Sequence, residues 1–312
     1  MIEFGVATAY GTMKRVLMHR PGEELQKVTD DTLEEFHFQR PVKKEEFLGD
    51  YNGMLELFQS HGVETVLLTD VLKSDDDAMS YIRHRPNMTY TRDLASVFNS
   101  GAVLMGPHLK GRWGDQWIVG RALERLGVPI LGSIDQPGFL EGGGVTLIGD
   151  DIAAASLCDR ANEAGTRALR ELIIGKDVKY FLEVPLPHGN VHIDGLFMVL
   201  DEKLCVIYEP MFDVFPCRLY EDGSSGFRNV MFRELLDERG FDCIATNLQE
   251  REMGLLNIVV TKRSERAIGF AGAARIGEKM TKYGIGLESF SADEMWQGNG
   301  GAHCMTCPFL LG

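Results

Sequence analysis

The sequence predicts an α/β protein whose five similar units close around one axis as a five-bladed α/β propeller. The main observation is a repeat: two short apolar strands, an amphipathic helix and a further apolar strand recur five times, roughly every 45 to 65 residues. Conspicuous polar residues also precede the strand pairs of successive units. Because no stretch has the composition of a linker, we expect residues 1–312 to form a single domain. A doubly wound parallel sheet is the alternative fold, but it does not explain the recurring hairpins.

Each unit contains one helix, indicated by apolar residues at helical spacing and by a glycine at or near its end. The predicted helices are Glu45–Ser60, Trp113–Leu126, Arg160–Ile173, Asn229–Glu238 and Gly272–Tyr283. A strand-like run follows each helix, at Glu64–Leu68, Val128–Leu131, Val178–Leu182, Phe241–Thr246 and Ile285–Phe290. The strand pairs ahead of the helices are clearest at Ser96–Phe98 with Val103–Met105, Val145–Ile148 with Ile152–Ala155, and Leu196–Leu200 with Leu204–Tyr208.

Composition and charge limit the classes of partner. Hydrophobic residues make up 44% of the chain and charged residues 25%, as in ordinary soluble globular proteins. The formal charge of −14 argues against nucleic acid, because binding to phosphate-rich polymers draws on clustered lysine and arginine. It is compatible with a cationic small-molecule substrate, although an acidic surface more often serves only solubility.

The chain has no apolar run as long as a membrane span, and residues 1–5 lack the features of a secretion signal. We therefore expect a cytoplasmic protein with no membrane partner. All six cysteines lie in the second half of the chain, and we expect them to be reduced thiols. The sequence leaves a homo-oligomer open.

Five polar residues stand out because of where they lie in the repeat. Asp93 precedes the strand pair of the second unit, Glu141 that of the third, and His192 and Asp194 that of the fourth. Cys304 follows the fifth unit, where a closed ring brings it back beside the first. Corresponding positions in a ring face the same centre, so we expect these side chains to share one pocket. The tail must then be anchored, because chain ends are otherwise poorly ordered.

This set of groups suits covalent chemistry on a planar cation. A thiol, with an ordinary pKa of about 8.5, needs a base or a cationic neighbour to react at neutral pH. His192 could supply or return protons, and Glu141 could orient its ring. Asp93 and Asp194 exceed what a hydrolytic Cys/His pair requires, and buried unpaired carboxylates are costly. They indicate a cationic ligand with several N–H donors, such as a guanidinium group.

Several of these residues also have a simpler interpretation. Asp93 could merely pair with Arg92, which is the commoner outcome for such neighbours. The glycines of residues 142–144 could form only a tight turn or bulge before a strand. His192, next to an apolar run, could be a satisfied core histidine.

Cys304 and Cys307 have the CxxC spacing of redox motifs, but that motif needs a helix N-terminus after it, and none is expected at this end of the chain. His303 adds a metal-ligand alternative. A structural zinc site, however, needs a second ligand pair, and the remaining cysteines have no paired spacing. We therefore expect no metal and no cofactor.

Four segments together resemble the ordered motifs of the guanidino-group-modifying superfamily, whose fold is a five-bladed α/β propeller, or pentein. The segments are Thr91-Arg92-Asp93, Glu141-Gly142-Gly143, His192-Ile193-Asp194 and Gly301-Ala302-His303-Cys304-Met305-Thr306. The superfamily contains arginine deiminases, dimethylarginine dimethylaminohydrolases and amidinotransferases. The resemblance is closest to arginine deiminases, because residues 19–22, 87–93 and 303–308 are similar to their opening, Thr-Arg-Asp and closing motifs.

The resemblance implies a hydrolase that acts on free L-arginine without a cofactor. Cys304 would attack the guanidinium carbon while Asp93 and Asp194 hold the group. His192, oriented by Glu141, would protonate the departing ammonia and then activate a water. The product of hydrolysing the covalent amidino-thioether would be citrulline.

The same resemblance implies residues for the amino-acid end of the substrate. Arg112 and Arg160 lie 19 residues after Asp93 and Glu141, respectively, and would clamp the α-carboxylate. The remaining substrate-binding positions are Asn87, Tyr90 and Gly301.

Two departures from the family pattern leave the exact reaction open. Only 61 residues separate Leu25 from Asn87, too few for the extra helical domain of full-length arginine deiminases. Gly144 stands where the family usually has aspartate, which could alter the support of His192. The alternatives are an arginine dihydrolase giving ornithine, carbon dioxide and two ammonias, an arginine-dependent amidinotransferase, and a non-catalytic arginine sensor. We also expect the glycine-containing segment Met211–Gly226 to be a mobile loop near the site.

Overall fold

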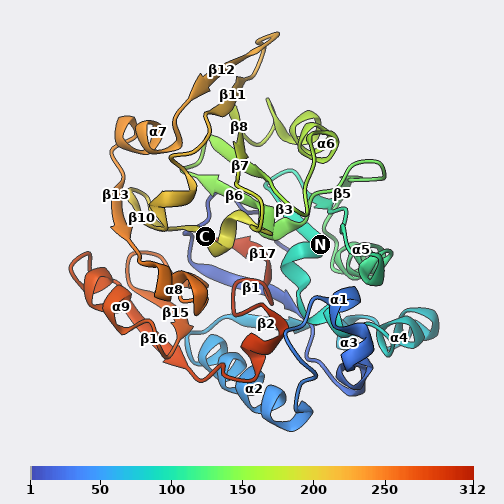
Figure 1. The fold of residues 1–312 in the computed structure, drawn as a ribbon. Coiled ribbons are helices and arrows are strands. Elements are labelled where there is room, and N and C mark those ends of the chain that lie inside the picture. Colours follow the sequence, from blue (N-terminus) through green and yellow to red (C-terminus); the bar gives the residue numbers. More distant parts are fainter. Residues whose placement is uncertain (1) are drawn as a thin grey trace.

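The computed structural model describes residues 2–312, and Figure 1 shows five small sheets around the centre of the molecule, with helices at the periphery. In every blade the inner two strands are antiparallel, and the third strand runs parallel to the middle one, as a crossover connection requires. The predicted α/β propeller of five repeated units is confirmed. No helix within residues 2–312 has the length and apolar character needed to cross a membrane.

Each blade is one sheet, whose strands pair in the order that follows. The sheets are β17 (Cys307–Leu311), β1 (Met13–Met18) and β2 (Glu64–Leu67); β3 (Ala95–Val97), β4 (Ala102–Leu104) and β5 (Ile130–Ser133); β6 (Val145–Ile148), β7 (Ile152–Leu157), β8 (Tyr180–Pro185), β11 (Cys217–Glu221) and β12 (Phe227–Val230); β9 (Phe197–Asp201), β10 (Leu204–Ile207) and β13 (Asp242–Ala245); and β14 (Val259–Lys262), β15 (Arg266–Phe270) and β16 (Gly286–Phe290).

The five predicted helices are present, each within the expected residues or extended by one. They are α2 (Lys44–Ser60), α5 (Asp115–Arg125), α6 (Glu163–Ile173), α7 (Phe232–Glu238) and α9 (Ala274–Thr281). Four shorter helices were not predicted, namely α1 (Leu33–Phe36), α3 (Leu68–Val71), α4 (Asp76–Ile82) and α8 (Leu248–Glu252).

Helix α2 illustrates why these helices form and how they pack. Phe47, Tyr51, Met54 and Phe58 recur at spacings of three and four residues, which places them on one face, and all four are fully buried. Burial of each such side chain stabilises the fold by about 1.5–3 kcal/mol.

The ring closes because the two ends of the chain share a blade. Strand β17 pairs antiparallel with β1, with Val16 opposite Pro308 and Leu17 opposite Cys307. Figure 1 marks both ends near the centre of the ring. The segment that carries Cys304 is therefore anchored by the strand that follows it.

Short 3₁₀ turns lead into the inner strands of three successive blades. They are η4 (Thr91–Leu94) before β3, η6 (Gly142–Gly144) before β6 and η7 (Ile193–Gly195) before β9. The polar motifs predicted to face one centre lie in or beside these turns.

The segment Met211–Gly226 is not a mobile loop near the site, and that expectation was wrong. Cys217 and Leu219 are buried while their neighbours are partly exposed, which is the alternation of a strand. This strand, β11, pairs with β8, and β12 extends the sheet further, so the hairpin protrudes at the outer edge of the ring (Figure 1).

Candidate active site

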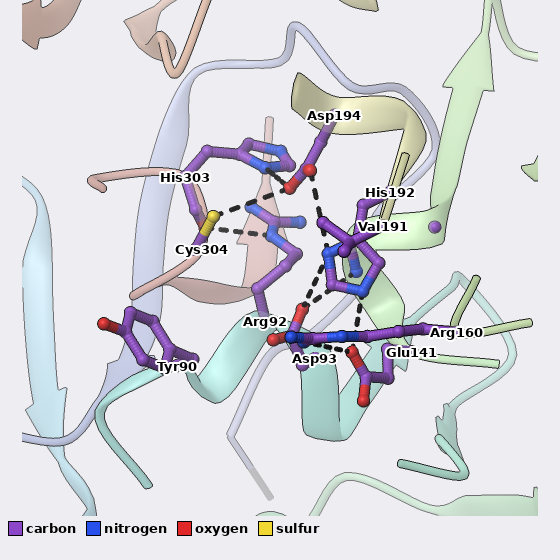
Figure 2. Close-up of polar contacts among 12 residues, drawn as sticks. Tyr90, Arg92, Asp93, Glu141, Arg160, Val191, His192, Asp194, His303 and Cys304 are labelled. Carbon is purple, nitrogen blue, oxygen red and sulfur yellow. Dashed lines mark hydrogen bonds and ion pairs between the residues drawn. The ribbon is translucent and has the colours of Figure 1, made fainter. Parts of the chain in front are cut away.

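Cys304 lies in the turn before β17, at the centre of the ring, and its side chain is 9% exposed. Its Sγ accepts a hydrogen bond from Asn257 Nδ2 at 3.2 Å and lies 3.8 Å from Asp194 Oδ2. Figure 2 shows the sulfur, the Asp194 carboxylate and the His192 ring facing one another. The structure therefore brings the predicted nucleophile to the predicted acidic groups.

The turn is rich in glycine because aromatic rings press against it. A Cβ at Gly300 would lie 2.4 Å from Tyr90 Cε1, and one at Gly301 would lie 2.4 Å from Phe270 Cζ. Side chains at these positions would push the turn away from the rings. Gly301, a predicted substrate-binding residue, is packed beneath the site, whereas Gly300 lines its cleft.

His192 and Glu141 form a hydrogen-bonded pair across two blades. His192 Nε2 lies 2.7 Å from Glu141 Oε2, and the other oxygen of the fully buried carboxylate accepts from the backbone N–H of His108 at 3.1 Å. A Cβ at Gly143 would lie only 2.6 Å from His192 Nδ1, so the ring can approach this turn only because residue 143 is glycine. By contrast, a Cβ at Gly144 would face Ser156, one step removed from the imidazole.

The two predicted carboxylate-binding arginines lie against the acidic groups of the site. Arg112 Nη1 donates to Asp93 Oδ2 at 2.7 Å, and Arg160 Nη1 donates to Glu141 Oε2 at 3.1 Å. Arg112 is fully buried and also lies 3.7 Å from Glu141. In this arrangement both guanidinium groups neutralise protein carboxylates, so binding a substrate carboxylate requires at least one of them to turn.

The charges around Glu141 favour an ionised carboxylate and a protonated imidazole. Burial would raise the pKa of Glu141, but Arg160, the His192 hydrogen bond and Arg112 outweigh it and hold that pKa well below its usual range. Burial would likewise lower the pKa of His192, but Asp93 and Glu141 together raise it. His192 is thus suited to donate a proton near neutral pH.

The charges around Cys304 have the opposite effect. Burial, followed by the carboxylates of Asp194 and Asp93, raises the pKa of the thiol far above its usual range. Asp194 itself stays ionised because its hydrogen bond with His303, at 2.8 Å from Nδ1, lowers the carboxyl pKa despite burial. The thiol is therefore protonated in the substrate-free protein.

A cleft with two branches reaches Cys304 and His192. The first branch is lined by the predicted substrate residues Asn87, Tyr90, Asp93, Arg112 and Arg160. The second is lined by groups from the fourth and fifth blades, including Asn190, Asp194, Arg251, Asn257 and Trp296. His37 lines both branches, and burial together with Arg160 lowers its pKa to about 4.

Three buried polar atoms in the first branch have no hydrogen-bond partner within residues 2–312. They are the acceptor Asn87 Oδ1 and the donors Arg112 Nε and Arg160 Nη2. A buried polar group without a partner costs about 1–3 kcal/mol, so a ligand that completes these bonds gains that energy. An acceptor beside two cationic donors is complementary to an ammonium group and a carboxylate.

One atom each from Asp93, Glu141 and His192 lie within 4.8 Å of one another, a spacing that could hold a metal ion. Two guanidinium groups already neutralise the two carboxylates. The positive charge beside these carboxylates is therefore supplied by the protein's own side chains.

Asn257 is a site residue that the sequence analysis missed. Besides its bond to Cys304 Sγ, its Oδ1 accepts the backbone N–H of His303 at 2.7 Å. It lies two residues before β14, just as Asp93 lies two residues before β3. The unit repeat would have indicated Asn257 if the β14–β15 hairpin had been recognised.

Most of the chain matches a known family. A family model described as arginine deiminase matches residues 27–310. The chain belongs to the arginine deiminase family. As a member of that family it is a guanidino-group hydrolase, and the superfamily resemblance carried by the four motifs is confirmed.

Individual relatives in the arginine deiminase family and its superfamily are distant in sequence. An arginine deiminase of Mycobacterium marinum is 20% identical, with 98% of each chain aligned. The structure of dimethylarginine dimethylaminohydrolase from Pseudomonas aeruginosa, in complex with citrulline, is 17% identical with a TM-score of 0.72, over 96% of this chain and all of that one. A cyanobacterial arginine dihydrolase is 16% identical with a TM-score of 0.71, over 95% of this chain and 41% of that one.

Proposed function

We propose that this protein hydrolyses free L-arginine to citrulline and ammonia, as a single catalytic domain over residues 1–312 that works in the cytoplasm. The observation that carries the proposal is the cleft in which a cysteine, a histidine paired with a carboxylate, and two further carboxylates face one another. Membership of the arginine deiminase family supports the choice of a guanidino substrate.

The unpartnered atoms of the first branch support an α-amino acid as the rest of the substrate. Asn87 Oδ1 would accept from the α-ammonium group, and Arg112 and Arg160 would receive the α-carboxylate. The substrate guanidinium would replace Arg112 on Asp93, and the released Arg112 side chain could then turn to the carboxylate. Binding of the two ends would therefore be coupled.

Binding of the cation would also activate the nucleophile. A guanidinium group between Asp93 and Asp194 offsets the two charges that raise the pKa of the Cys304 thiol. The thiolate then forms a bond to the guanidinium carbon, and the carbon–nitrogen bond to one terminal nitrogen breaks. His192 supplies the proton that lets this nitrogen leave as ammonia.

Water completes the reaction at the same centre. Neutral His192 accepts a proton from the water, whose oxygen bonds to the amidino carbon, and the carbon–sulfur bond breaks to restore Cys304. Arginine and water thus give citrulline and ammonia, with no change in oxidation state and no cofactor.

Product analysis tests this proposal. Purified protein is incubated with arginine, with and without glycine or lysine, and the products are identified by mass. Citrulline as the final product, with none from Cys304→Ser, is the expected result. Ornithine would indicate the dihydrolase, a new guanidino compound the amidinotransferase, and no product despite binding an arginine sensor; each of these would overturn the deiminase assignment.

A further inference from the structure

A second cavity lies along the axis of the ring, and we call it the axial cavity. Each inner strand contributes to its wall, with Val97 from β3, Leu147 from β6, Met198 from β9, Val260 from β14 and Leu311 from β17. The space between these walls is about 720 Å³, including the part open to solvent, which is within the range of small-molecule sites. No residue lines both this cavity and the active-site cleft.

Two polar side chains, Arg92 and His303, close the end of the axial cavity that is nearer the active site. The inner strands begin beside the site and run away from it, so residues further along β3 and β14 lie toward the other mouth. Figure 2 shows the Arg92 side chain lying behind Cys304 and His303. The cavity thus ends directly behind the nucleophile.

Arg92 differs from the two arginines of the active site in having no carboxylate partner. Arg112 and Arg160 each pair with a carboxylate, whereas Arg92 has no ion pair within 4.0 Å in the described part of the chain. Its Nε donates to the carbonyl of His303 at 3.2 Å, and Nη2 reaches Thr306 Oγ1 only at 3.4 Å. Nη1 has no partner among residues 2–312, so this cation can still bind an anion.

We propose that the axial cavity is a second small-molecule site, which takes a short-chain monocarboxylate with its carboxylate on Arg92 and its aliphatic body between the apolar walls. One guanidinium group without a carboxylate partner suits one carboxylate. Neither aspartate nor glutamate lines the cavity in the described residues, so the ammonium group of an amino acid has no partner there. The cavity therefore selects against arginine, citrulline and ornithine.

A ligand on Arg92 would affect the nucleophile from behind. The backbone N–H of Arg92 donates to the carbonyl of Cys304 at 3.2 Å, and the Arg92 cation lies close enough to attract the thiolate. A bound carboxylate reduces that attraction and raises the pKa of the thiol. A shift of half a pKa unit would slow alkylation of Cys304 about threefold at neutral pH.

Calorimetric titration of the whole protein tests the site with three probes of similar size: hexanoate, neutral hexanamide and zwitterionic 6-aminohexanoate. Only hexanoate should bind, and it should slow labelling of Cys304 by iodoacetamide. Absence of hexanoate binding, or equal binding of hexanamide, would overturn the proposal. These measurements need no turnover, so they are independent of the proposed deiminase reaction.

Two variants locate the bound hexanoate. Thr146, partly exposed in the axial cavity, is replaced in Thr146→Trp to fill the space without changing charge, and affinity should fall at least about tenfold. Arg160→Met removes a cation from the active-site cleft and should leave the affinity unchanged. The reverse pattern would place the ligand in the active site and refute the axial site.

Discussion

The two sides of the active-site cleft carry similar groups in opposite states of charge balance. On the side of Glu141, two guanidinium groups neutralise the carboxylates, and the His192 ring is held ready to protonate. On the side of Cys304, Asp194 faces a buried thiol with only a histidine as its hydrogen-bonded partner. The difference indicates that the side of Cys304 lacks one cation, which the substrate would bring.

Removal of the nucleophile should have the largest effect. Cys304→Ala is expected to lower citrulline formation by at least roughly 10⁴-fold, because no other group can form the covalent intermediate. Arginine should still bind, as measured by calorimetry, because the carboxylates that hold its guanidinium remain. Full turnover by this variant would eliminate the covalent mechanism.

Breaking the Glu141–His192 pair should have the next largest effect. Glu141→Gln is expected to lower kcat about 10²–10³-fold and to move the His192 limb of the pH–rate profile to lower pH, because the carboxylate raises the imidazole pKa. Glu183→Gln is a matched control, since Glu183 is also a buried carboxylate, but it bonds to Thr166 and Tyr220 outside the site. An unmoved profile in Glu141→Gln would contradict the pairing.

The acidic side of Cys304 can be tested without substrate. In the free protein, alkylation by iodoacetamide should accelerate as pH rises, because thiolate forms only at alkaline pH. Asp194→Asn removes a charge that raises the thiol pKa, so alkylation at pH 7 should become about tenfold faster. Surface Asp237→Asn serves as the control, and an unchanged or slower rate in Asp194→Asn would show that this carboxylate does not suppress the thiolate.

The smallest expected effect concerns Asn257, with the opposite sign. Asn257→Ala removes a donor to Sγ, so alkylation should slow and kcat should fall by about tenfold. Asn247→Ala, which removes only the N-cap of α8, controls for general loss of stability. Faster alkylation in Asn257→Ala would show that the amide does not stabilise the thiolate.

The sequence was most informative where one local pattern determines the structure. The helix of the first blade followed from apolar spacing in residues 44–60, and corresponding turns indicated that Asp93, Glu141 and His192 would meet. It was least informative where the outcome depends on which side chains meet in space. The ion pairs of Arg112 and Arg160, 19 residues from their partners, follow from packing that no linear spacing records.

Two misses have a local cause. The segment 217–230 looked like a loop because its turn is rich in glycine and serine, although alternate residues of β11 are buried. The β14–β15 pair was overlooked because Arg266 and Lys262 interrupt its apolar run. Missing that hairpin also hid Asn257, which the symmetry of the blades would otherwise have indicated.

The pairing of β17 with β1 has a consequence for how the enzyme is made. A ribosome that has translated four blades has already released every acidic group of the cleft, but neither the sulfur nor the strand that fastens it exists yet. Prematurely terminated chains would therefore be inert towards guanidines, whatever fraction of them folds. Activity would appear only after the final strand has emerged, which a time course of synthesis in a cell-free extract would reveal as a lag.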